Sequence, residues 1–151
     1  MSRRNYGQAC SIARSLEIVG ERWTFLIIRN ALIGECRFDS FLNSLGLPRN
    51  VLTDRLNTLV DHGIFQRVPY QQRPLRNEYK LTTKGRELMP ILLALMQWGD
   101  RYTTDENGPP RIQYHEECGS PTEVHIVCTK CGHAVGPYEV NTREAVAVSA
   151  T

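Results

Sequence analysis

The residues best suited to metal chemistry form two pairs of metal-binding side chains near the end of the chain. His115 and Cys118 are separated by two residues, and Cys128 and Cys131 repeat that spacing after nine intervening residues. Imidazole and thiolate ligands in two such pairs are typical of a tetrahedral Zn²⁺ site. The sequence therefore predicts a zinc-ribbon-like extension that binds Zn²⁺ through His115, Cys118, Cys128 and Cys131.

Alternatives to this ligand set stay open. His133 or His125 could replace His115 as the fourth ligand. The extension could instead fold without a metal, held by a strand at residues 123–127, or its Cys-x-x-Cys pair could act as a redox dithiol. A disulfide framework is not expected, because the five cysteines are an odd number and no apolar leader follows the basic start. No internal repeat is visible.

Cys10 is a separate candidate for thiol chemistry. It lies at the start of the first predicted helix, where the helix dipole lowers the pKa of a thiol, and Arg14 follows one turn later. Two interpretations stay open: a reactive thiol, or a small apolar residue at a dimer seam. Cys36 precedes a two-residue strand stub, and we expect it to be inert.

A second group of candidate residues is basic and polar and suits DNA. Residues 48–86 carry eight basic and three acidic side chains. Arginine pairs bidentately with guanine and asparagine with adenine, while basic side chains in general contact phosphates. The segment therefore predicts a DNA interface rather than only a solvated surface. Its candidate residues are Arg49, Asn50, Thr53, Asp54, Arg55, Asn57, Arg73, Arg76 and Lys84.

The elements that position these residues form the outline of a helix-turn-helix. Residues 39–45 predict a short helix that ends at Gly46, and a second helix runs from Pro48 to His62. At about 100° per residue, its leucines share one face and its asparagines the other. The polar face is expected to enter the major groove. Asp54 would repel phosphates, so it could pair with Arg55, orient another arginine, or accept from a cytosine amino group.

A hairpin and further helices complete the predicted fold. Residues 64–70 and 77–81 read as strands around a basic turn, a wing that could reach the minor groove or remain an ordinary exposed hairpin. Residues 10–19 and 22–32 read as helices. Residues 83–102 read as one long helix that Pro90 should kink. Its wide apolar stripe predicts a homodimer through the terminal helices, the alternative being packing within one chain.

A series of short motifs in fixed order resembles the HxlR-type winged helix-turn-helix regulators, a MarR-like family. The resemblance covers residues 10–102 and implies a homodimeric regulator that binds operator DNA near its own gene. Some members of the family sense oxidants or electrophiles through a cysteine near the position of Cys10, so the resemblance also implies a redox-sensing role for Cys10. The wing departs from the expected pattern at residues 75–77. The motifs are Cys10-Ser11-Ile12, Ile18-Val19-Gly20-Glu21-Arg22-Trp23, Arg37-Phe38, Leu52-Thr53-Asp54-Arg55-Leu56, Leu59-Val60-Asp61-His62-Gly63-Ile64, Glu78-Tyr79-Lys80-Leu81-Thr82, Gly85, Leu88, Pro90 and Trp98-Gly99.

Length and composition set the limits of the organisation. The chain has 151 residues, of which 41% are hydrophobic and 23% charged, which suits one main domain with a small appendage. We expect a mostly α fold with a β-hairpin wing: a winged helix-turn-helix at 10–108, a Cys/His-containing β-rich extension at 109–140, and a disordered tail at 141–151. No apolar run approaches the about 18 residues of a membrane span, so we expect a cytoplasmic protein without a membrane partner.

Charge and motif content favour one function. Residues 1–104 hold 15 basic and 9 acidic residues, whereas residues 105–151 hold 3 and 7. A basic body suits an anionic partner. There is no glycine-rich phosphate loop, nucleophile elbow or paired acid, so an enzyme is not expected. We predict a sequence-specific DNA-binding transcription regulator, a repressor that responds to a redox, electrophilic or small-molecule signal; the alternative is a protein-interaction module without specific DNA binding.

Overall fold

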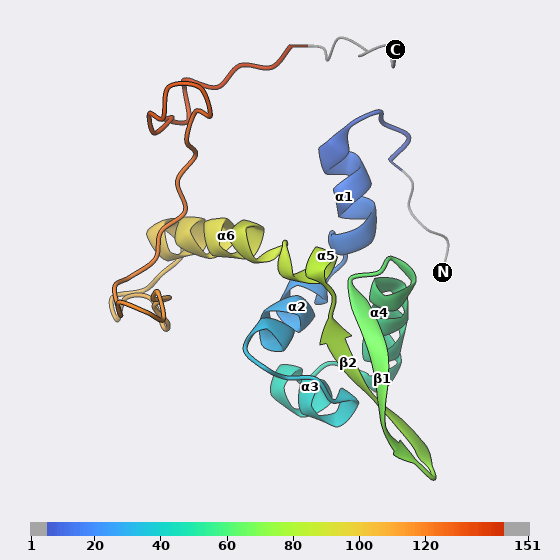
Figure 1. The fold of residues 1–151 in the computed structure, drawn as a ribbon. Helices are drawn as coiled ribbons and strands as arrows, with labels where there is room; N and C mark the ends of the chain where they lie inside the picture. Colours follow the sequence, from blue (N-terminus) through green and yellow to red (C-terminus); the bar gives the residue numbers. More distant parts are fainter. Residues whose placement is uncertain (1–5, 144–151) are drawn as a thin grey trace. The chain divides into compact units, whose positions relative to one another are not determined.

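The computed structural model describes residues 6–143 (Figure 1). Contacts divide the chain into two compact units, Met1–Met96 and Gln97–Thr151. Residues 144–151, which make up most of the tail predicted to be disordered, lie outside the described residues. Within the described part of the chain, no helix has the length and apolar character needed to cross a bilayer.

The first unit carries the winged helix-turn-helix that the sequence predicts. Its order is α1 (Ser11–Val19), α2 (Thr24–Leu32), α3 (Phe38–Leu45), α4 (Arg49–Asp61), β1 (Phe65–Gln72), β2 (Leu75–Leu81), α5 (Thr83–Arg86) and then α6 (Met89–Tyr102), whose last turns belong to the second unit. The strands pair as an antiparallel hairpin that projects past α3 and α4 (Figure 1). The fold is therefore mostly α with a two-stranded wing, as predicted.

One apolar core holds α2, α3, α4 and the base of the wing together. Ile27 and Ile28 of α2 are fully buried, and so are Leu52 and Leu56 of α4. Phe41 of α3 meets Phe65 of β1 edge to face, with ring centroids 6.4 Å apart. Because this core contacts both helices of the helix-turn-helix and the first residue of the wing, it fixes α4 and the hairpin relative to each other.

The long helix predicted for residues 83–102 is interrupted, which corrects the sequence interpretation. Thr82 caps α5 by accepting a hydrogen bond from Gly85 N at 3.2 Å, and α5 ends at Arg86. A second helix, α6, then begins at Met89. Pro90 therefore lies in the first turn of α6 rather than inside a continuous helix. Its missing N–H is harmless there, since the first amides of a helix have no partner within it.

The wing is longer than predicted and contains an irregularity. Phe65 pairs with Leu81 at its base, and the register shifts between Pro69 and Gln71. A third segment joins at the base, since Tyr79 N donates to Cys36 O at 2.6 Å. The two-residue stub expected near position 37 is therefore an isolated bridge to β2, and it ties the segment before α3 to the wing.

The second unit contains a small hairpin at residues 113–122. Thr122 N donates to Gln113 O at 2.9 Å, and His115 N donates to Ser120 O at 2.8 Å. Gly119 N closes the loop by donating to His115 O at 2.8 Å. Gly119 has φ +68°, a left-handed conformation that glycine adopts without strain. The loop is thus a tight backbone-bonded turn.

A second hairpin at residues 126–135 has the same bonding. Val135 N donates to Ile126 O at 2.8 Å, and Cys128 N donates to His133 O at 2.9 Å. Gly132 N closes the loop by donating to Cys128 O at 2.8 Å, and Gly132 has φ +73°. The strand predicted at residues 123–127 is not formed; only Val127 makes an isolated bridge. The extension is therefore built from a repeated hairpin that the sequence analysis did not detect.

Candidate nucleic-acid interface

The turn between α3 and α4 sets which face of α4 reaches solvent. Gly46 ends α3 with φ +62°, and its N–H donates to Leu42 O at 3.0 Å. Leu47 then enters the core at 3% exposure. The leucines of α4 consequently face inward. Four predicted DNA-contacting residues share the exposed side: Asn50, Thr53, Asp54 and Asn57.

Arg49 is the first residue of α4 and lies over the start of α3. Its guanidinium is 5.0 Å from the centre of the Phe38 ring, and its Nη2 is 3.4 Å from Asp39 Oδ1. Both charged side chains are about two-thirds exposed, so this ion pair contributes no more than about 1 kcal/mol. Arg49 can therefore exchange Asp39 for a stronger anionic partner at little cost.

Arg55 does not join the exposed face. Its side chain is only 13% exposed, with Nη2 2.9 Å from Asp54 Oδ2 and Nη1 3.8 Å from Glu21 Oε2. Arg55 therefore joins α4 to the segment before α2. Of the three roles considered for Asp54, the structure shows the pairing with Arg55.

Asn57 connects α4 to the wing. Arg67 Nη2, on β1, donates to Asn57 Oδ1 at 2.6 Å. Thr53 Oγ1 donates to the carbonyl oxygen of Arg49 at 2.9 Å, within the same helix. Thr53 therefore uses its hydroxyl hydrogen within the helix, although the residue itself is exposed.

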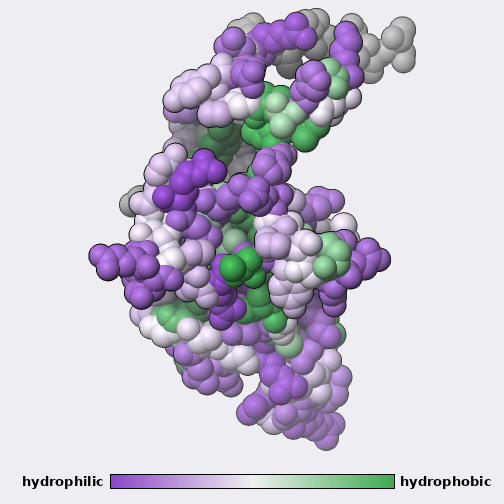
Figure 2. Space-filling view, turned by 90° about the vertical axis from the view of Figure 1, so that its left-hand side faces the viewer, coloured by the Kyte–Doolittle hydropathy of each residue, from purple (hydrophilic) through white to green (hydrophobic). Residues whose placement is uncertain are grey.

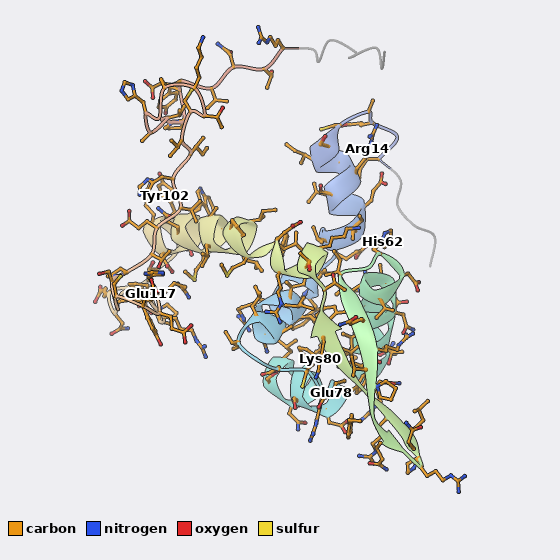
Figure 3. The ribbon with its side chains drawn as sticks, viewed as in Figure 1. Arg14, His62, Glu78, Lys80, Tyr102 and Glu117 are labelled. Carbon is orange, nitrogen blue, oxygen red and sulfur yellow. The ribbon has the colours of Figure 1, made fainter. Side chains whose placement is uncertain are left out.

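A charged cluster lies where the wing meets the start of α3. Glu78 Oε2 is 3.2 Å from Lys80 Nζ, and its Oε1 is 3.4 Å from Arg37 Nε; Glu78 and Lys80 lie on β2 (Figure 3). The hydrogen bond from Lys80 and then that from Arg37 lower the pKa of Glu78 below its ordinary value, against the opposing effect of burial. The Arg37 guanidinium also stacks on Tyr70, 4.7 Å from the ring centre.

These elements enclose a polar groove of about 600 Å³ between α3, the start of α4 and the wing. Three arginines line it from three elements: Arg37 before α3, Arg49 on α4 and Arg76 on β2. The end of the molecule that carries the wing is mostly hydrophilic in the view of Figure 2. The remaining lining residues are Phe38, Asp39, Ser40, Asn43, Tyr70, Leu75, Asn77 and Tyr79.

The lining of the polar groove differs from the set of DNA-contacting residues predicted from the sequence. Arg37 and Tyr70 were not predicted, because only the pairing of Arg37 with β2 brings them together. Arg73 is exposed in the turn of the wing. Lys84 lies elsewhere: its Nζ donates to the carbonyl oxygen of His62 at 2.8 Å, and it lines a different, apolar groove.

That apolar groove has a volume of about 420 Å³ and lies between α1 and the start of α6. Ile12 is 71% exposed and Ile91 53% exposed at its edges. Burial of such side chains stabilises a protein by about 1.5–3 kcal/mol each. An exposed apolar groove of this kind is typical of an interaction surface. Its other lining residues are Ser11, Ser15, Leu16, Ile18, Val19, Phe25, Ile64, Lys84 and Leu88.

The two thiols of the first unit lie in contrasting environments. Cys10 is the residue before α1, where the backbone amides of Ala13 and Ile12 lower the pKa of its thiol. Burial and the neighbouring Glu78 raise the pKa of Cys36. The pKa of Cys10 is therefore lowered and that of Cys36 raised, and the inertness expected of Cys36 stays a prediction.

The predicted metal ligands form pairs rather than one cluster. His115 Nδ1 lies 3.3 Å from Cys118 Sγ in the first hairpin, and Cys128 and Cys131 lie in the second. Among residues 6–143, no three histidine, cysteine or acidic side chains gather in a group that could hold a metal ion. The zinc site stays a prediction.

Two helices joined by a tight glycine turn, an exposed polar second helix and a basic wing define a winged helix-turn-helix DNA-binding protein. The family description "HxlR-like helix-turn-helix" matches residues 18–107. The chain belongs to this family of transcriptional regulators and is not an enzyme. The resemblance seen in the sequence is thereby confirmed for the winged helix.

Individual relatives agree with this assignment. An uncharacterized HTH-type transcriptional regulator of Mycobacterium tuberculosis is 45% identical over 135 residues, covering 89% of this chain and 84% of the relative. The crystal structure of PA1607, named as a candidate transcription factor, has a TM-score of 0.82 and 33% identity, covering 92% of this chain and 97% of PA1607. That likeness extends beyond the winged helix. The reduced redox regulator HypR has a TM-score of 0.57 and 31% identity, covering 61% of this chain and 92% of HypR.

Proposed function

We propose that the protein is a sequence-specific repressor that binds a double-stranded operator as a homodimer in the cytoplasm. The observation that carries the proposal is the convergence of Arg37, Arg49 and Arg76 on one groove beside the exposed face of α4. In a winged helix-turn-helix, a helix occupies the major groove. A basic groove between that helix and a wing suits the phosphate backbone that runs between the two grooves of DNA.

The exposed residues of α4 then divide into different roles. Arg49 and Asn50, at the helix start, enter the major groove first and suit guanine and adenine. Thr53 and Asn57 follow on the same face. Arg49 leaves Asp39 when it binds DNA, so Asp39 holds the arginine in place in the free protein.

The wing and the segment before α3 supply charge rather than base recognition. Arg73 and Arg76 are exposed on the hairpin and suit phosphates or the minor groove. Arg37 suits a phosphate and is already positioned by Glu78 and Tyr70. Arg55 and Lys84 stand outside this interface, because they bond to Asp54 and to the carbonyl oxygen of His62 respectively.

The test is a fluorescence-anisotropy titration of the reduced protein on DNA from upstream of its own gene. A scrambled duplex of equal length is the control, and each is measured at two salt concentrations. We expect the native fragment to bind at least about a thousandfold more tightly. Equal affinity for both duplexes would refute sequence specificity on that fragment. Absence of binding to either would favour the alternative, a protein-interaction module.

The second copy is proposed to cover the apolar groove of α1 and α6. A palindromic operator needs a two-fold dimer, and the exposed Ile12 and Ile91 supply apolar surface for it. We expect a dimer in size-exclusion chromatography with light scattering at micromolar concentration. Ile12→Glu should give a monomer that keeps its helical circular dichroism. A wild-type monomer, or a dimer unaffected by Ile12→Glu, would refute this assignment.

Cys10 is proposed as the site through which an oxidant or electrophile releases the operator. Its ionised thiol is favoured by the start of α1, and α1 also lines the proposed dimer surface. A known regulator of similar structure, HypR, is described as a redox regulator. Oxidation of the wild type should weaken operator binding, and Cys10→Ser should abolish that response while Cys36→Ser retains it. Normal release from the Cys10→Ser variant would refute the sensor role.

A further inference from the structure

The two hairpins of the extension place their metal-binding side chains at equivalent positions. His115 and Cys128 both occupy the first position of the loop, where the residue's N–H and carbonyl are both hydrogen bonded. Cys118 and Cys131 both occupy the fourth position, directly before the glycine with positive φ. All three backbone hydrogen bonds of one hairpin have a counterpart in the other. The extension thus contains one ligand-presenting loop twice.

The first loop brings its two ligands close together. His115 Nδ1 and Cys118 Sγ are 3.3 Å apart. With Zn–N near 2.05 Å and Zn–S near 2.3 Å, two ligands of a tetrahedral zinc ion lie about 3.6 Å apart. The first loop therefore needs a shift of only a few tenths of an ångström to chelate the metal through these two atoms. The second loop has the same backbone and two thiols.

The structure also discriminates among the histidines. His133 occupies the position equivalent to Ser120, two residues beyond the second ligand, where it is outside the ligand loop. His125 lies between the hairpins, and its Nε2 is 3.1 Å from Glu123 Oε2. Only His115 is placed as Cys128 is. His133 and His125 therefore serve as matched controls for the ligand set.

The extension has few apolar contacts to hold it together. Between residues 97 and 143, no side chain is buried, and Ile126 and Val127 are 63% and 52% exposed. A module of this size without a core usually needs a metal or disulfide for stability. Three or more ligands do not yet meet in residues 6–143. A metal that binds one pair can draw in the other, since the connector is only residues 123–125.

We propose that the two hairpins of one chain close on a single Zn²⁺, with His115, Cys118, Cys128 and Cys131 as its four ligands. A structural zinc site is four-coordinate, so neither two-ligand hairpin completes it alone. Each thiol gives up its proton to solvent when it binds the metal, and the histidine binds as neutral imidazole through one ring nitrogen. The site organises the extension and does not depend on DNA binding by the first unit.

The experiment is a Co²⁺ titration of the full-length, reduced, metal-free protein, followed by Zn²⁺ displacement. We expect one Co²⁺ per chain, with the visible absorption of a tetrahedral ion and the charge-transfer absorption of thiolate ligands. Zn²⁺ should abolish both signals at one equivalent. Metal analysis of protein purified in Zn²⁺ should likewise give one zinc per chain.

Matched variants test the ligand set, and helical circular dichroism checks that each remains folded. Cys118→Ser and His115→Ala should each weaken Co²⁺ binding at least about tenfold, whereas His133→Ala and His125→Ala should leave it unchanged. Failure to bind either metal would overturn the proposal. One metal per two chains, insensitive to His115→Ala, would show instead that the Cys-x-x-Cys loops of two copies share it. Loss of binding in His133→Ala would overturn the ligand assignment.

Discussion

Replacement of Arg76 by alanine tests whether the wing contacts phosphate. Arg76 is exposed on β2 and lines the polar groove together with Arg37 and Arg49. Each phosphate that a basic side chain neutralises adds about 0.9 to the slope of log affinity against log salt. Arg76→Ala should therefore reduce the magnitude of that slope by about 0.9.

The same relation gives the loss of affinity. If a phosphate contact adds nothing to the DNA affinity at 1 M salt, it raises that affinity about eightfold at 0.1 M salt. Arg76→Ala should therefore weaken binding about eightfold at 0.1 M salt and about fifteenfold at 0.05 M. Because phosphates carry no sequence information, the operator and a scrambled duplex should lose affinity equally. Arg76→Lys keeps the charge and should retain the slope.

Lys84→Ala is the matched control, since it also removes one positive charge from the first unit. Lys84 Nζ donates to a carbonyl oxygen at the end of α4, and its side chain lines the apolar groove. Anisotropy titrations at four salt concentrations should show an unchanged slope for this variant. Equal reductions in the two variants would mean that the assay reports net charge alone. An unchanged slope in Arg76→Ala would refute the phosphate contact.

Further predictions concern stability and thiol chemistry. Gly85→Ala should lower the free energy of unfolding in urea by about 2 kcal/mol or more, because the new Cβ would clash with a backbone carbonyl. Gly99→Ala, in open helix, should leave that free energy unchanged or raise it by up to about 1 kcal/mol. Equal effects of the two substitutions would contradict the packing described for Gly85. The pKa of Glu78 is lower in the folded than in the unfolded protein, so the charged carboxylate stabilises the fold at pH values above the unfolded pKa. The difference in unfolding free energy between wild type and Glu78→Gln should therefore shrink as pH falls through the folded pKa of Glu78. A difference that does not depend on pH would contradict this. Peptide-resolved iodoacetamide labelling from pH 6 to 10 should modify Cys10 at lower pH than Cys36; the reverse order would contradict the environments described.

The fold could be predicted from the sequence because its periodicities are strong. The leucines of α4 repeat at helical spacing and are all buried, and the wing follows as an alternating segment. The break between α5 and α6 could not be predicted this way, since apolar residues continue at helical spacing across it. Gly85 of α5 also packs tightly against Ile64 and Leu81 at the base of the wing, and periodicity does not record such a contact.

The candidate DNA interface was predictable only in part. Arg55 was assigned to a flank, yet at 100° per residue it lies only about 60° from Leu52, and in the structure its side chain is only 13% exposed beside Asp54 and Glu21. The helical wheel therefore already placed Arg55 close to the buried face of α4. Arg37 is different, because it reaches the groove through its bridge to Glu78, 41 residues later. Such a pairing depends on how the hairpin docks, and spacing in the sequence does not encode it directly.

The duplicated hairpin shows why a structural repeat can be absent from the sequence. Residues 113–122 and 126–135 share little beyond a Cys-Gly pair at the same place. The repeat consists of backbone hydrogen bonds, which most residue types can make, and of one glycine per loop that adopts a positive φ. What the loops have in common chemically is a ligand at the first and fourth positions. That shared arrangement is the observation that supports the proposed zinc site.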